Sequence, residues 1–134
     1  MDPVLLDIFT REVDGHLAVL RKFAAACTQP GAAYAVPESL YRSCHTLNGS
    51  MAMARVEIGL PLSEALNRLV SLAYNRPARL PPGTIATLRD TAARIEALLA
   101  YLGEPWRPIP QTADLEQRLR DHAAALDQPQ EEPL

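Results

Sequence analysis

Residues 40–54 read LYRSCHTLNGSMAMA, and this stretch decides the fold. Successive residues of an α-helix are rotated by about 100°, so residues that recur every three or four positions share one face. Apolar and small residues recur here in that way, and they predict an amphipathic helix with one buried stripe. His45 falls roughly opposite the stripe, so we expect its imidazole to be exposed to solvent. The stripe consists of Leu40, Cys44, Leu47, Met51 and Ala54.

The polar face around His45 carries small and hydrogen-bonding residues. Gly49 and Ala52 follow the histidine by one and two helical turns. A glycine inside a helix costs about 0.5–1 kcal/mol relative to alanine, so its use here indicates a need for space. Either Glu38 or another polar group of this face can orient the imidazole ring, and the sequence leaves that choice open. The polar neighbours are Glu38, Tyr41, Arg42 and Asn48.

Four further amphipathic segments surround this helix in the sequence. Prolines stand at or just before the expected helix starts, at Pro3, Pro37, Pro61 and Pro81-Pro82, where they fit the first helical turn. Apolar stripes at helical spacing predict that the whole chain is helical. They consist of Leu6, Phe9, Val13, Leu17, Leu20 and Ala24; of Leu62, Leu66, Leu69 and Ala73; of Ile85, Leu88, Ala92, Ile95, Leu99 and Leu102; and of Leu115, Leu119, Ala123 and Leu126.

The predicted fold is all-α, an antiparallel up-and-down four-helix bundle with an additional C-terminal helix. Short connections favour antiparallel neighbours, because a short loop returns the chain beside the helix that it leaves. Trp106 and Ile109 are candidates for docking the proline-rich connector on the bundle. We expect four segments: the bundle at 1–102, the connector at 103–111, the accessory helix at 112–127 and a disordered tail at 128–134.

Composition narrows the classes of function. The 134 residues are 48% hydrophobic but only 5% aromatic, which favours helix-on-helix packing. The formal net charge of −3 gives no general basic surface for nucleic acid or anionic lipid. No apolar run reaches the roughly 20 residues of a membrane-spanning helix, and nothing reads as a signal peptide, so we expect a cytoplasmic protein. Cys27 and Cys44 lack metal-ligand spacing and are expected to be reduced, and no metal site is predicted.

Residues 45–50, HTLNGS, resemble the His-x-Leu-Lys-Gly-Ser signature of histidine-containing phosphotransfer (HPt) domains. The form with asparagine in the lysine position resembles the HPt modules of CheA-type hybrid histidine kinases in type IV pilus chemosensory systems, the ChpA- and PilL-like family. The resemblance continues through residues 58–70, IGLPLSEALNRLV, and residues 7–9 with Glu12 suit the first helix of such a domain. It covers most of the chain from residue 7 to about residue 102.

The resemblance implies a role for His45 in a phosphorelay. His45 would accept a phosphoryl group from a CheA-like kinase domain and donate it to an aspartate of a response-regulator receiver. ATP and Mg²⁺ would come from these partners, and the chain itself is expected to bind no cofactor, no nucleic acid and no membrane. As an isolated domain it is expected to be monomeric. The residues implied around the phosphate and the docking partner are Glu38, Tyr41, Arg42, Asn48, Gly49 and Ala52.

The sequence contains no kinase or receiver signature, so the expected context is one module of a longer hybrid histidine kinase. Asn48 departs from the general pattern, because a lysine in its place would put a positive charge one turn from the phosphorylated nitrogen. Arg42, three residues before His45, is the candidate to compensate for that charge. Two other classes stay open: a pseudo-HPt module that binds receivers or kinase without being phosphorylated, and a plain helical assembly domain.

Overall fold

The computed structural model describes residues 1–76 and 78–127, and it consists of five packed helices. The predicted all-α class is therefore confirmed. The expected tail at 128–134 lies outside the described residues. The helices are α1 (Pro3–Ala26), α2 (Glu38–Met53), α3 (Leu60–Asn75), α4 (Pro82–Gly103) and α5 (Ala113–Asp127).

The first helix begins as its sequence predicts. The side chain of Asp2 accepts hydrogen bonds from the backbone N–H groups of Val4, at 2.7 Å, and Leu5, at 3.4 Å. Pro3 occupies the first turn, where its missing N–H leaves no bond unmade. Because Asp2 satisfies free donors of that turn, the cap fixes where α1 starts.

The connection between α2 and α3 is tight and brings the two helices into close contact. Arg55, which follows the C-cap residue Ala54 of α2, adopts a left-handed conformation with φ of 55°. The N–H of Val56 donates to the carbonyl oxygen of Met51 at 3.0 Å, which is the pattern of a helix-ending Schellman motif. At Gly59 an added Cβ would lie 3.1 Å from the sulfur of Met51. Glycine at this position therefore lets the start of α3 approach α2.

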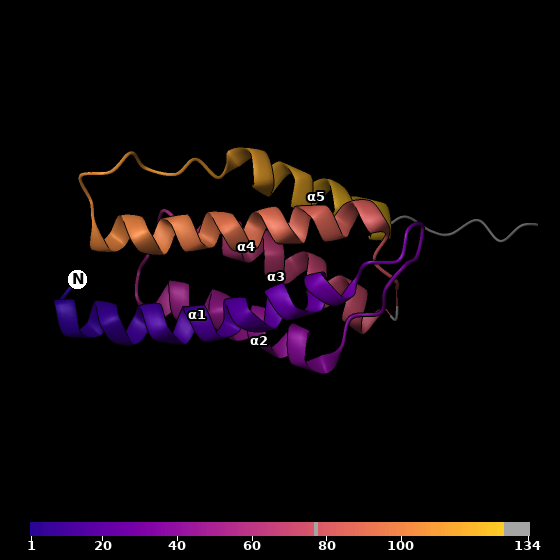
Figure 1. Cartoon of the computed structure of the whole chain (residues 1–134), viewed down its shortest axis with the longest axis horizontal. Helices are drawn as coiled ribbons and strands as arrows, with labels where there is room; N and C mark the ends of the chain where they lie inside the picture. The colour runs from indigo at the N-terminus through magenta and orange to yellow at the C-terminus, as the bar shows by residue number, and fades with distance from the viewer. Residues whose placement is uncertain (77, 128–134) are drawn as a thin grey trace, which may run out of the picture.

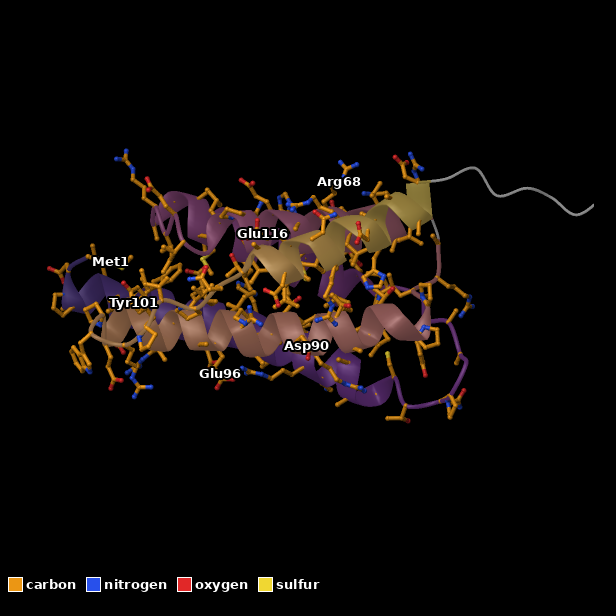
Figure 2. All side chains as sticks on the ribbon, turned by 90° about the horizontal axis from the view of Figure 1, so that it is seen from above. Met1, Arg68, Asp90, Glu96, Tyr101 and Glu116 are labelled. Atoms are coloured by element: carbon orange, nitrogen blue, oxygen red, sulfur yellow. The ribbon has the colours of Figure 1, made fainter. Side chains whose placement is uncertain are left out.

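Helix α5 packs against both α3 and α4: it lies on the side of the molecule away from α1 and α2 (Figure 1) and, seen from above, between α3 and α4 (Figure 2). The main packing partners are α1 with α2, α2 with α3, α1 with α4 and α3 with α5, while α3 and α4 hardly touch. At one end of the molecule the two loops that precede α2 and α4 are joined by paired backbone hydrogen bonds between Tyr34 and Leu80, at 2.9 and 2.7 Å. The core is continuous across all five helices.

Polar side chains join α4 to α5. The two nitrogens of His122 lie 3.3 Å from the hydroxyl of Thr84 and 2.9 Å from the hydroxyl of Thr87, and both threonines are buried. Arg118 donates to Thr87 at 3.1 Å and to Asp90 at 2.9 Å. Burial and the neighbouring positive charge of Arg118 lower the pKa of His122, against a smaller opposing effect of Asp121. His122 of α5 is therefore part of the interface with α4.

This lowered pKa predicts a loss of stability on acidification. Between the lowered pKa of the folded state and the ordinary value of about 6.5, the unfolded chain binds more protons at His122 than the folded chain does. Stability should therefore rise with pH through this window and fall as the pH is reduced below about 6.5. The His122→Gln variant should show a shallower fall. Urea-denaturation midpoints across this pH range, with His16→Gln as the control, measure the difference; equal slopes for all three proteins would contradict it.

The connector between α4 and α5 departs from one expectation. Trp106 is 79% exposed and Ile109 is 50% exposed, so the tryptophan does not dock on the bundle as predicted. Polar contacts hold the end of the connector instead: Arg94 of α4 donates to the backbone carbonyl of Gln111 and to the carboxylate of Asp114. None of the helices in the described part of the chain is both long and apolar enough to cross a membrane.

Candidate functional site

The imidazole of His45 is exposed near the middle of α2. The neighbouring residue Cys44 is 2% exposed and Leu47 is 1% exposed, so the core fixes the rotation of the helix about its axis. Burial raises the pKa of the Cys44 thiol to about 12, which keeps this sulfur protonated and unreactive. Of these adjacent groups, the imidazole is the nucleophile that solvent and a second protein can reach.

An aromatic row starts at His45 and crosses to α3. The ring of Tyr41, one turn before the histidine, lies 6.2 Å from the imidazole between centroids with an interplanar angle of 25°. Its other neighbour is Tyr74 of α3, at 4.4 Å and 10°. Tyr41 could be identified from the sequence but Tyr74 could not, because their pairing depends on the register between α2 and α3. Tyr41 is thereby held between His45 and the adjacent helix.

Asn48, one turn after His45, is also tied to α3. The hydroxyl of Ser63 donates to the amide oxygen of Asn48 at 2.9 Å. Ser63 is fully buried and Asn48 is half-buried. Ser63 lies within the segment at 58–70, but it has no local sequence signal that would mark it as part of the site. We call the surface of α2 around His45 the histidine face. It consists of Tyr41, His45, Asn48, Gly49 and Ala52. The contacts of Tyr41 with Tyr74 and of Asn48 with Ser63 join this face to α3.

Glu38 and Arg42 lie beside the histidine face and pair with each other. The guanidinium of Arg42 is 2.6 Å from the carboxylate of Glu38, one turn away, and their side chains are 75% and 58% exposed. An exposed pair of this kind contributes about 0–1 kcal/mol, so either side chain can leave it at little cost. No hydrogen bond to the His45 ring occurs among the described residues, and the carboxylate of Glu38 is directed to Arg42.

Open space surrounds Gly49. A Cβ built at this position has no neighbouring atom within 4 Å, apart from the helix's own backbone, and Ala52 is likewise exposed. The fold of this chain therefore gives no steric reason for glycine at position 49. Gly15, in the middle of α1, is exposed with equally open surroundings, and it offers a matched position for comparison.

An exposed apolar cluster lies where the start of α1 meets the end of α2. Met53, which lies off the apolar stripe of α2, is 88% exposed. Leu5 and Ile8 of α1, exposed by 58% and 57%, line the same shallow groove as Met53. Glu12 and Ser50 join the two helices there through a 2.8 Å hydrogen bond. This end of α2 thus presents apolar side chains that the fold does not cover.

Metal ligands do not gather in the described part of the chain: its His, Cys, Asp and Glu residues form no group of three or more that could hold a metal ion. The cysteines Cys27 and Cys44 are both buried and free. Comparison of the chain with family models, with curated proteins and with solved structures finds no match. We therefore infer the function from the chemistry of the histidine face.

Proposed function

We propose that this chain is a histidine phosphotransfer module of a chemosensory phosphorelay, with His45 as the phosphoryl acceptor. One observation carries the proposal: the imidazole is exposed on a helix whose opposite side is core, and the glycine one turn away borders open space. A relay histidine has to enter two protein active sites in turn, so a cleared surface suits that task. The resemblance of residues 45–50 to HPt domains supplies the donor and the acceptor.

The proposed chemistry consists of two transfers. A neutral imidazole nitrogen of His45 attacks the γ-phosphorus of ATP held by a CheA-like kinase domain; the N–P bond forms, the bond from phosphorus to the bridging oxygen breaks, and ADP leaves. A receiver aspartate then attacks the same phosphorus, the N–P bond breaks, and the imidazole nitrogen keeps the electron pair. Such reactions depend on in-line positioning and on charge stabilisation, which the partners and their Mg²⁺ would supply.

For the fold we propose the arrangement that the resemblance implies, an antiparallel up-and-down bundle of α1 to α4 with α5 as an additional helix. We also propose a cytoplasmic module that acts with kinase and receiver domains in the control of type IV pilus motility. These finer assignments rest on the resemblance of residues 45–50 and 58–70 to that family. The short connections support the bundle, since they favour antiparallel neighbours.

Incubation of the chain with a cognate CheA-like kinase domain and labelled ATP tests the proposal. We expect the protein to acquire a label that is labile in acid and stable in base, as an N–P bond is, and to lose it to a receiver domain. The kinase is first shown to be active by its transfer to an established HPt substrate. Absence of label under those conditions would contradict the relay function.

Gly49 provides a second test, in which stability and activity should change in opposite directions. Gly49→Leu should stabilise the fold by about 0.5–1 kcal/mol, because leucine is a better helix former and the space is open. The same side chain should slow phosphorylation by the kinase about tenfold or more by blocking its approach. Urea denaturation and initial rates measure the two effects. Gly15→Leu is the matched control and should give the stability gain alone; equal rates for both variants and the parent would contradict a docking face at Gly49.

A non-phosphorylated interaction module is the second candidate, and Asn48 is the observation that favours it. Asparagine lacks the positive charge that the HPt signature places one turn from the histidine, and the guanidinium of Arg42 is paired with the carboxylate of Glu38. In that case a receiver would bind the histidine face, and binding would survive His45→Gln but not Gly49→Leu.

A further inference from the structure

The hydrogen bond between Ser63 and Asn48 links the buried side of α3 to the histidine face. We propose that Ser63 is a positioning residue, which orients the Asn48 amide so that its NH₂ group faces a phosphoryl group on His45. The inference rests on the proposed function for its biological meaning, but its physical content concerns only the lifetime of phosphorylated His45. It assigns a role to a residue that the HPt resemblance does not single out.

The serine hydroxyl has one hydrogen and two acceptors within reach. It lies 2.9 Å from the amide oxygen of Asn48 and 3.0 Å from the carbonyl oxygen of Leu60 in its own helix. Ser63 itself is 0% exposed, so water does not compete for this hydrogen. Full burial also fixes the position of the hydroxyl, so that its hydrogen bond can orient the half-buried side chain of Asn48.

Holding the amide oxygen determines where the amide donors are. The oxygen and the NH₂ group occupy opposite sides of the planar carboxamide, so an oxygen bound to Ser63 leaves the NH₂ group directed away from α3. If the amide turned over, its NH₂ group would bind the serine and its oxygen would face outward. The structure has the first orientation, with the amide oxygen on Ser63, and this leaves the NH₂ group of Asn48 available as a hydrogen-bond donor.

This orientation matters because a phosphoryl group presents three negatively polarised oxygens, which require donors. Asn48 follows His45 by one turn on the same face of α2. In place of the charged lysine of the HPt signature, an oriented amide supplies a neutral donor. An amide turned the other way would place its oxygen beside the phosphoryl oxygens and repel them. By binding the amide oxygen, Ser63 therefore makes Asn48 present its NH₂ group, a hydrogen-bond donor, to the phosphoryl group.

The lifetime of phosphohistidine tests this role without a kinase. Phosphoramidate, a small phosphoryl donor, modifies imidazole directly: the ring nitrogen forms the N–P bond and ammonia leaves. In hydrolysis, water attacks the phosphorus, the N–P bond breaks, the imidazole nitrogen takes up a proton, and inorganic phosphate is released. We expect Ser63→Ala to hydrolyse roughly threefold to tenfold faster than the parent, the size of one hydrogen bond. Label that is absent from His45→Gln identifies the phosphate on His45.

Two comparisons separate positioning from a general structural effect. Ser43→Ala removes a buried hydroxyl from α2 instead of α3, and it should leave the lifetime of phosphorylated His45 unchanged. In an Asn48→Lys background the amide is gone, so adding Ser63→Ala should no longer alter the lifetime. An unchanged lifetime in Ser63→Ala, or an equal effect in both backgrounds, would overturn the inference. If phosphoramidate labels His45 and an active kinase does not, the proposed relay function is contradicted. The hydrolysis rates of phosphorylated His45 in the parent and in Ser63→Ala still decide the role of Ser63.

Discussion

Replacement of His45 by glutamine should abolish phosphorylation of the chain while leaving its fold unchanged. The amide nitrogen of glutamine is not a nucleophile, because its lone pair is delocalised into the carbonyl group, so no N–P bond can form. The exposed imidazole takes part in no hydrogen bond within the described residues, and glutamine is at least as good a helix former as histidine. The substitution removes only the exposed contact of the imidazole with the ring of Tyr41, so we expect the fold to be retained and the loss of label to reflect the loss of the nucleophile.

The measurement is the label retained after incubation with active kinase, together with the urea-denaturation midpoint of each protein. The two remaining histidines are the controls. His16→Gln alters a half-buried residue of α1, and His122→Gln alters the α4–α5 interface; both should keep the full label. Label that persists in His45→Gln would place the acceptor elsewhere and would contradict the proposed function.

The helices could be predicted because their signals are local. Most residues of the predicted stripes are buried in α1 to α5, although Leu6, Leu102 and Leu126 are only half-buried. The predicted start at Pro3 is the observed one, whereas α4 begins at Pro82 itself and not after it. A start at Pro37 was predicted for α2 and one at Pro61 for α3, and each differs from the observed start by one residue. Apolar periodicity and proline at the first turn act within a few residues, so one sequence suffices to locate them.

The contacts that complete the histidine face could not be predicted, because they depend on the register between helices. Tyr74 meets Tyr41, and Ser63 meets Asn48, only because α3 returns beside α2 after the tight turn at Arg55 and the close approach at Gly59. The same holds for the placement of α5. A stripe of leucine and alanine predicts that a helix is buried on one side, but it does not say which two helices will cover it.

The placement of α5 gives the prediction with the largest effect on stability. Leu115 and Leu119 are both 0% exposed, and Ala123 is 2% exposed, between α3 and α4. Leu119→Ala should destabilise the fold by about 3 kcal/mol, the sum of lost transfer energy and a residual cavity. That is a large share of the roughly 5–15 kcal/mol by which a domain of this kind is stable. Leu126→Ala, at a half-buried position of the same helix, should cost less, and urea denaturation compares the two.

Removal of the whole helix extends this prediction and tests the expected domain division at residue 102. A chain that ends there would expose the apolar sides of α3 and α4 that α5 covers, and these two helices hardly touch each other. We therefore expect the truncated chain to bind a hydrophobic dye and to lose cooperative unfolding, while retaining much of its helical circular dichroism. Cooperative unfolding at an unchanged midpoint would instead show that residues 1–102 form a domain by themselves. Since α3 carries Ser63 and Tyr74, loss of α5 should also disturb the histidine face and shorten the lifetime of phosphorylated His45.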